Sequence, residues 1–230
     1  MNIGIVGSGD IGSTLGRLWA KKGHKILFSF SHDKQKLERL AQECGNGSRA
    51  VTPYEAVSLS EVVLFSVPWT QIDEAYKQIG RFDGETVIDT TNPYIDEQMN
   101  VQQFDESTSS SEEVARKLEG AKVVKAFNTL RDETLWERSG QGLVIFFAGD
   151  YPQMKQQKIS RLIEDAGFVP YDVGPLREGK KQEPGTDRYL KELTLEEARR
   201  LVGEQPGEGN VIRGEVDSSQ WQEHSSPTNR

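Results

Sequence analysis

A glycine-rich turn close to the N-terminus constrains this chain more than any other stretch of its sequence. Residues 3–6 (Ile-Gly-Ile-Val) form a short apolar run, as expected for a strand that is buried in a parallel sheet. Gly7, Gly9 and Gly12 follow with the spacing G-x-G-x-x-G, and from Asp10 onward the apolar residues recur at helical spacing. This order of strand, glycine turn and helix is the one that a dinucleotide-binding site needs.

Each glycine has a different role in such a turn. Gly7 permits the tight turn, Gly9 lets a pyrophosphate approach the backbone, and Gly12 lets the helix pack close to the strand. Gly16 either extends this close-packing face or is a tolerated helix glycine. Asp10 brings a carboxylate near the pyrophosphate, which costs energy unless it points away, and its alternative role is to cap the helix. We expect a cofactor to contact the whole turn, namely Gly7, Ser8, Gly9, Asp10, Ile11 and Gly12. The alternative is a glycine-rich turn without a ligand.

The composition narrows the classes of function. The chain has 230 residues and a formal net charge of −8, so it offers no basic stripe to nucleic acid. Cys44 is its only cysteine, which excludes an internal disulfide and a thiolate metal site, and we expect it to be half-buried or buried on a helix. The start lacks the basic region of a signal peptide, and no apolar stretch approaches the length of a membrane span. These features predict a cytoplasmic protein without a metal, a nucleic-acid partner or a membrane.

Strands and helices alternate through most of the sequence. Strands are expected at residues 3–6, 25–30, 49–51, 61–66, 85–89, 121–126, 142–148 and 168–172. Helices are expected at residues 10–22, 33–44, 53–57, 70–79, from 112, at 152–166 and at 193–202. Such alternation predicts an α/β fold with a doubly wound, mostly parallel sheet of the NAD(P)-binding Rossmann type. Residues 1–202 would form this domain with a short C-terminal helical extension, and the polar residues 203–230 would form a mobile, disordered tail.

The residues after the second expected strand discriminate between the two nicotinamide cofactors. A site for NAD usually offers an acidic residue to the ribose hydroxyls at this place. Here Ser31 and His32 stand instead, and Lys34 and Lys36 follow, so hydroxyls and cations are available for a 2′-phosphate. Asp33 comes one or two positions late and fits the N-cap of the next helix better. We therefore expect NADP(H), contacted by Ser31, His32 and Lys36, although an ordinary exposed histidine would also explain His32.

Three further loops should meet the same crevice, because they follow the ends of other strands. They supply Ser66, Pro68 and Trp69, then Asn92, and then Ala126 and Asn128. The two asparagines could bond amides or hydroxyls, and Trp69 is either a nicotinamide contact or a core aromatic. The serine run at residues 107–111 could be mistaken for a phosphate site, but we expect a solvated loop whose Ser111 caps the next helix.

Six motifs, taken in order, resemble those of one known family. They are residues 4–12 (GIVGSGDIG), 28–33 (FSFSHD), 66–69 (SVPW), 89–94 (DTTNPY), 124–129 (VKAFNT) and 174–176 (GPL). The set is similar to the deazaflavin-dependent (coenzyme F420-dependent) NADP oxidoreductases over residues 1–201. The resemblance implies an NADPH-binding Rossmann fold that passes hydride to or from a deazaflavin. It also implies 2′-phosphate contacts at Ser31, His32 and Lys36, and nicotinamide contacts near Pro68, Asn92 and Ala126.

Two functions remain open. The first is an NADPH-dependent oxidoreductase that transfers hydride between NADP(H) and a small or flat acceptor, with a deazaflavin as one candidate. The second is a redox sensor or regulatory protein that holds NADPH without turnover. Hydride transfer needs proximity and orientation more than an acid or a base, so no catalytic residue is assigned. An acceptor pocket is expected between residues 126–129 and 174–176, unless Phe127 belongs to the core and Asn128 caps a helix. A homodimer is left open.

Overall fold

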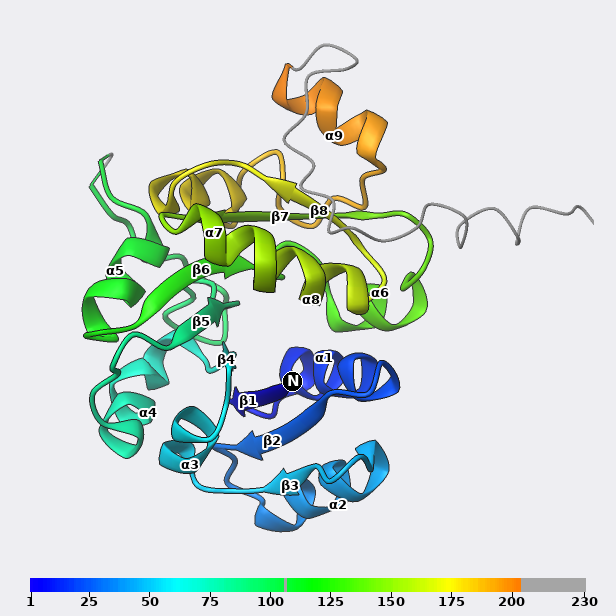
Figure 1. The fold of residues 1–230 in the computed structure, drawn as a ribbon. Coiled ribbons are helices and arrows are strands. Elements are labelled where there is room, and N and C mark those ends of the chain that lie inside the picture. The colour runs from blue at the N-terminus through cyan, green and yellow to red at the C-terminus, as the bar shows by residue number, and fades with distance from the viewer. Residues whose placement is uncertain (106, 204–230) are drawn as a thin grey trace, which may run out of the picture.

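Eight strands within the described residues, 1–105 and 107–203, form one sheet in this computed structural model. The order is β3-β2-β1-β4-β5-β6-β7-β8, from β3 at the bottom of Figure 1 to β8 at the top. The strands are β1 (Asn2–Val6), β2 (Lys25–Ser29), β3 (Arg49–Ala50), β4 (Val62–Phe65), β5 (Thr86–Asp89), β6 (Lys122–Ala126), β7 (Val144–Gly149) and β8 (Val169–Asp172). The predicted α/β fold with a mostly parallel, doubly wound sheet is confirmed.

Helices cover both faces of this sheet. They are α1 (Asp10–Lys21), α2 (Lys34–Cys44), α3 (Pro53–Ser58), α4 (Ile72–Ile79), α5 (Ser110–Lys117), α6 (Asp132–Glu137), α7 (Pro152–Met154), α8 (Ser160–Asp165) and α9 (Leu195–Val202). Two 3₁₀ segments, η1 (Trp69–Gln71) and η3 (Leu176–Gln182), and one π-helical turn, η2 (Lys155–Ile159), complete the list. The apolar side chains of α1, α2, α6 and α8 share one core with one face of the sheet. Those of α3, α4 and α5 share a second core with the other face.

The last two strands run against the other six. Ala126 of β6 pairs with Phe147 of β7 in antiparallel register, and β8 pairs with β7 in parallel. The connection from β6 to β7 explains this reversal. The only helix of this connection in the described residues is α6, which has six residues and is therefore about 9 Å long. After so short a helix, the chain is still near the edge of the sheet at which β6 ends. β7 starts from that edge and runs back along β6.

Two helical segments differ from their predictions. α6 was not predicted, because six residues are too few to show a helical period. The helix expected at residues 152–166 consists of α7, the π-helical turn η2 and α8 in succession. The extension α9 is confirmed, with Thr194 as its N-cap in a reciprocal capping box with Glu197.

The start of α5 corrects the prediction for the serine run. Ser109, and not Ser111, is the N-cap: its side chain accepts a hydrogen bond from the backbone N–H of Glu112, whose carboxylate bonds back to Ser109. Ser110 and Ser111 are fully buried rather than solvated. The reason is that α5 packs against η3, a segment whose position cannot be read from the local sequence. A carboxylate oxygen of Glu183 accepts from the N–H of Ser110, at 2.6 Å, so this helix end already holds an anion.

The predicted tail falls outside the part of the chain that the structure describes. Its division from the domain at residue 202 stays a prediction, since only Gly203 of it is described. Among the described helices, none has both the length and the apolar composition to cross a bilayer.

Candidate functional site

The glycine turn between β1 and α1 is built by close packing. Gly7 has a φ of 101°, and a Cβ there would collide with the carbonyl oxygen of Ser66. A Cβ on Gly12 would collide with the carbonyl oxygen of Gly7, and one on Gly16 would press on the ring of Phe28. The predicted tight turn at Gly7 and close packing at Gly12 are therefore confirmed, and of the two alternatives for Gly16 the close-packing one holds. Gly9 is different, because a Cβ there would meet nothing within 4 Å.

The N-terminus of α1 faces this open space without a capping side chain. Gly9 is its N-cap, so no side-chain oxygen accepts from the first N–H groups of the helix. The expectation that Asp10 caps the helix is wrong: Asp10 is its first residue, and its side chain is exposed. Ser8 is buried and donates from Oγ to the carbonyl oxygen of Ser29, at 3.0 Å, which ties the turn to β2. A 12-residue helix whose first N–H groups are free is suited to bind a phosphate at its N-terminus.

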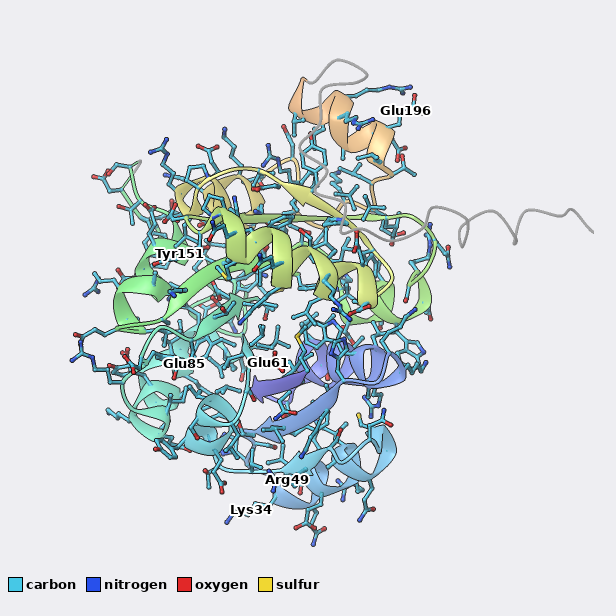
Figure 2. All side chains as sticks on the ribbon, in the orientation of Figure 1. Lys34, Arg49, Glu61, Glu85, Tyr151 and Glu196 are labelled. Atoms are coloured by element: carbon cyan, nitrogen blue, oxygen red, sulfur yellow. The ribbon has the colours of Figure 1, made fainter. Side chains whose placement is uncertain are left out.

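The residues after β2 lie at the neighbouring strand end, since β1 and β2 are parallel partners. Ser31 and Lys36 are half-buried, and His32 is exposed. Asp33 is the N-cap of α2, as predicted, and its carboxylate accepts from the N–H of Lys36 at 3.0 Å. This hydrogen bond, followed by the contact with Arg39, lowers the pKa of Asp33. Lys34, at the start of α2, extends away from the molecule in Figure 2.

Sequence reasoning missed Arg39 at this strand end. Its Nη2 lies 3.1 Å from Oδ2 of Asp33, so a guanidinium stands at the start of α2 beside the expected phosphate contacts. The signal was local, since six positions separate the two residues. It was weak, because an exposed arginine on a helix face is common.

The loop after β4 is held by Trp69. This residue is 9% exposed and belongs to the core beneath α4, which fits the core alternative for its role. Its Nε1 donates to Oε1 of Gln102 at 2.7 Å, and its ring meets Phe104 edge to face. Ser66 is half-buried and Pro68 is exposed, so these two remain at the surface of the loop.

Asn92 and Asn128 join the ends of β5 and β6. Nδ2 of Asn92 donates to the carbonyl oxygen of Asn128, and Nδ2 of Asn128 donates to Oδ1 of Asn92, both at 3.1 Å. Asn128 also donates to the carbonyl oxygen of Gln182, at 2.8 Å. The alternative in which Asn128 caps a helix is wrong, since the N-cap of α6 is Arg131. The two side chains that the sequence singled out therefore hold each other.

Phe127 and Ala126 next to them are buried. Phe127 has a φ of 60° and packs edge to face on Trp19, with ring centroids 5.9 Å apart, which confirms the core alternative for its side chain. Ala126 is the last residue of β6 and pairs with Phe147. The backbone turn at Phe127, in a region that non-glycine residues rarely adopt, redirects the chain toward the site.

A buried ion pair lies directly beneath this loop. Nζ of Lys125 is 3.0 Å from Oδ2 of Asp89, and neither side chain is exposed to solvent. Nζ of Lys125 also donates to the carbonyl oxygen of Thr91, and Oδ1 of Asp89 accepts from the N–H of Thr91 at 2.8 Å. Both polar groups of the Thr91 peptide are thus fixed by one charged pair, immediately before Asn92.

A pocket of about 170 Å³ opens over these strand ends. It is lined by Ile11 of α1, by Thr90, Asn92 and Met99 after β5, by Phe127, Asn128, Leu130, Arg131 and Asp132 after β6, and by Tyr189 and Leu190. The glycine turn, the loop after β5 and the loop after β6 therefore converge, as the sequence predicted for a doubly wound sheet. Trp69 and Pro68 are not among its lining residues.

The loop at residues 174–176 does not form the second wall. β8 runs antiparallel to β6, so this loop leaves β8 toward the opposite edge of the sheet, where Gly174 accepts from the N–H of Gly149. The chain is back beside Asn128 at Gln182, and Tyr189 and Leu190 line the pocket instead. That expectation rested on a parallel β8, and the antiparallel β7 overturns it.

Comparison with known proteins agrees with this geometry. Residues 2–93 match the model of a family described as NADP oxidoreductase, coenzyme F420-dependent. A hypothetical protein from Sinorhizobium meliloti has a similar structure, with 28% identity and a TM-score of 0.74, over 84% of this chain and 95% of that one. A candidate F420-dependent NADP reductase from Arthrobacter sp. FB24 follows with 18% identity and a TM-score of 0.69, over 84% and 98% of the two chains.

Larger enzymes share the fold. A reductive aminase from Aspergillus terreus, solved with NADPH, cyclohexanone and allyl amine, has 14% identity and a TM-score of 0.58. The match covers 88% of this chain but 60% of the aminase, and at this identity it shows the fold alone. The match over residues 2–93 confirms the family resemblance for that part of the chain, and the chemistry of that family is NADP-dependent oxidoreduction.

Proposed function

From the coenzyme F420-dependent NADP oxidoreductase domain at residues 2–93, we propose that this chain is an enzyme that transfers hydride between NADP(H) and a small or flat acceptor. The observation that carries the proposal is the contrast within the glycine turn. Gly7 and Gly12 are needed for packing, whereas the position of a Cβ on Gly9 is empty and lies at the uncapped start of α1. A pyrophosphate fits that space and would accept from the first N–H groups of the helix.

The phosphorylated cofactor is favoured by the charges after β2. The only acid there, Asp33, already accepts from the N–H of Lys36 and pairs with Arg39. Ser31, His32 and Lys36 stay available as donors for a 2′-phosphate, and Arg39 adds a further cation. An acidic side chain aimed at the ribose hydroxyls, which NAD sites use, does not stand in the place that the fold assigns to it.

The nicotinamide ring would then lie along the ends of β4, β5 and β6, near Pro68, Asn92 and Ala126. When bound, the cofactor supplies the hydride. The contribution of the protein is orientation: Asn92 and Asn128 hold each other, and the Lys125–Asp89 pair fixes the peptide before Asn92. Such a fixed frame serves a reaction that depends on the distance between donor and acceptor carbons.

The acceptor would occupy the pocket beside Asn92 and Asn128. Its volume of about 170 Å³ is below the roughly 300–1,000 Å³ of pockets that enclose drug-sized ligands. A compact acceptor fits this volume, while a tricyclic deazaflavin would need the lining segments to move apart.

An acceptor panel tests the proposal. The purified full chain is given NADPH together with a deazaflavin, FMN, ferric chelates or small carbonyl compounds, and the loss of the reduced-nicotinamide absorbance is followed. We expect at least one of these acceptors to oxidise NADPH in proportion to enzyme concentration. If NADPH binds but no acceptor oxidises it, the enzyme proposal fails and a redox sensor that holds NADPH takes its place.

A further inference from the structure

Tyr189 brings a phenol into the pocket from a segment beyond the sheet. The backbone N–H of Leu190 donates to the carbonyl oxygen of Thr129, at 2.9 Å, which docks this segment on the loop after β6. Tyr189 and Asn128 line the same pocket, and Nδ2 of Asn92 lies 3.5 Å from the phenol oxygen of Tyr189. The hydroxyl thus lies within the frame that the proposed function assigns to hydride transfer.

The hydrogen bonds of Tyr189 leave its own proton available. Tyr94 donates to the phenol oxygen at 2.8 Å, and Nδ2 of Asn92 lies 3.5 Å from the same oxygen. Among the described residues, no acceptor takes the hydrogen of Tyr189. Burial, the largest cause, raises the pKa of Tyr189, while the charge of Arg131 acts in the opposite direction. A phenol of this kind is protonated at neutral pH and is ready to donate to a ligand oxygen.

Resting on the proposed function, we infer that the acceptor is a small carbonyl compound and that Tyr189 is its proton donor. Hydride passes from NADPH to the carbonyl carbon, and the C=O π electrons move to oxygen. The O–H bond of Tyr189 breaks, and its proton goes to that oxygen, so an alcohol and NADP⁺ are formed. The phenolate left on Tyr189 is reprotonated from Tyr94, which is half-exposed and recovers a proton from water. Donors aimed at the developing negative oxygen are the usual means of lowering such a barrier.

The charges around Tyr189 agree with a neutral or anionic carbonyl compound. Arg131, which is exposed, and Asp132, which is half-buried, both line the pocket at the start of α6. Beside it, the amide nitrogen of Asn128 donates to Asn92 and to Gln182, and the buried Lys125 ammonium pairs with Asp89. Tyr189 is thus a hydroxyl that can both reach a ligand and be resupplied with a proton.

Steady-state kinetics with Tyr189→Phe test the inference. Benzaldehyde, cyclohexanone and ethyl pyruvate are offered with NADPH to the wild type, and a deazaflavin and ferricyanide are offered in parallel. We expect at least one carbonyl compound to be reduced, and Tyr189→Phe to lower kcat for it about 100-fold or more, the usual contribution of a general acid. NADPH affinity and Tm should change little. The matched control is Tyr151→Phe, because Tyr151 (labelled in Figure 2) is exposed and is not among the residues that line the pocket.

Binding of an unreactive amide gives a second readout. Isobutyramide offers the same C=O acceptor without being reduced, so its affinity for the NADPH complex should fall at least about tenfold in Tyr189→Phe. The inference is overturned by equal isobutyramide affinities, or by a Tyr189→Phe variant that reduces carbonyl compounds at the wild-type rate. It is also overturned if a deazaflavin or ferricyanide oxidises NADPH and no carbonyl compound does, in which case the proposed function stands. If nothing oxidises bound NADPH, both fall.

Discussion

Lys125 is the residue on which the loop before Asn92 depends most. Its ammonium group contacts the Asp89 carboxylate and the Thr91 carbonyl oxygen, and all of these groups are buried. A buried ion pair of this kind contributes little to the free energy of unfolding, because the cost of removing both charges from water offsets their attraction. Removing one member is costly, because the other stays buried without a partner.

We expect Lys125→Met to lower the free energy of unfolding by about 3–5 kcal/mol, the range for breaking a buried ion pair. Denaturant unfolding measures this value. The matched control is Arg138→Met, which removes an exposed pair with Glu192 and should cost no more than about 1 kcal/mol. A similar small loss in both variants would show that water reaches Asp89.

A substitution of Gly9 tests the position of the pyrophosphate. Because a Cβ on Gly9 meets nothing within 4 Å, we expect Gly9→Val to fold normally and to lose NADPH affinity at least about 100-fold. Circular dichroism and a fluorescence titration measure the two halves of this prediction. Gly12→Val is the contrasting variant, since its side chain collides with the Gly7 carbonyl oxygen and should destabilise the fold itself. Unchanged NADPH binding by a folded Gly9→Val would place the pyrophosphate elsewhere.

At the level of single residues, the sequence predicted the steric needs of the glycine turn but assigned the caps of α1 and α5 to the wrong residues. The spacing of Gly7 and Gly12 reports the steric needs of one turn, so the tight turn and the close packing could be read directly, whereas the role of Gly9 toward a pyrophosphate stays a prediction. Tyr189 and Tyr94 are 95 positions apart and meet only through the path of the chain, so nothing in either neighbourhood indicated the contact. The order of motifs predicted that Asn92 and Asn128 would be near each other, but not that they bond to each other.

Among the elements, α5 shows how tertiary packing alters a local rule. Any of three serines could cap this helix by composition, and the one chosen, Ser109, is set by the burial of Ser110 and Ser111 against η3. The direction of β7 could not be predicted from the sequence for a related reason. The sequence reports that a strand follows β6, but the shortness of α6 decides which way that strand runs.

Serine-to-alanine changes at the start of α5 measure this assignment. We expect Ser109→Ala to lower the free energy of unfolding by about 1 kcal/mol, because it removes the N-cap. Ser111→Ala should be neutral or slightly stabilising, since its buried hydroxyl has no hydrogen-bond partner among the described residues. Thermal or urea unfolding separates the two. A larger loss of stability in Ser111→Ala than in Ser109→Ala would show that Ser111 is the N-cap.

At the scale of the whole molecule, the expected cofactor contacts lie along one edge of the sheet. β1, β2, β4, β5 and β6 are parallel, so the loops after them open in one direction. Alternation of strands and helices was enough to predict this edge. The alternation could not predict the second wall of the pocket. Residues 182–190 reach the loop after β6 only because β7 reverses the direction of the chain.

We propose that this edge of the sheet binds NADPH, with the 2′-phosphate on Ser31, His32 and Lys36. Titration calorimetry of the full chain with NADPH and NADH tests it most directly. We expect NADPH to bind at least about tenfold more tightly, a difference of about 1.4 kcal/mol, because Asp33 is engaged with Arg39 and the N–H of Lys36 and leaves the cations free to meet the phosphate. Equal affinities, or tighter binding of NADH, would contradict the account.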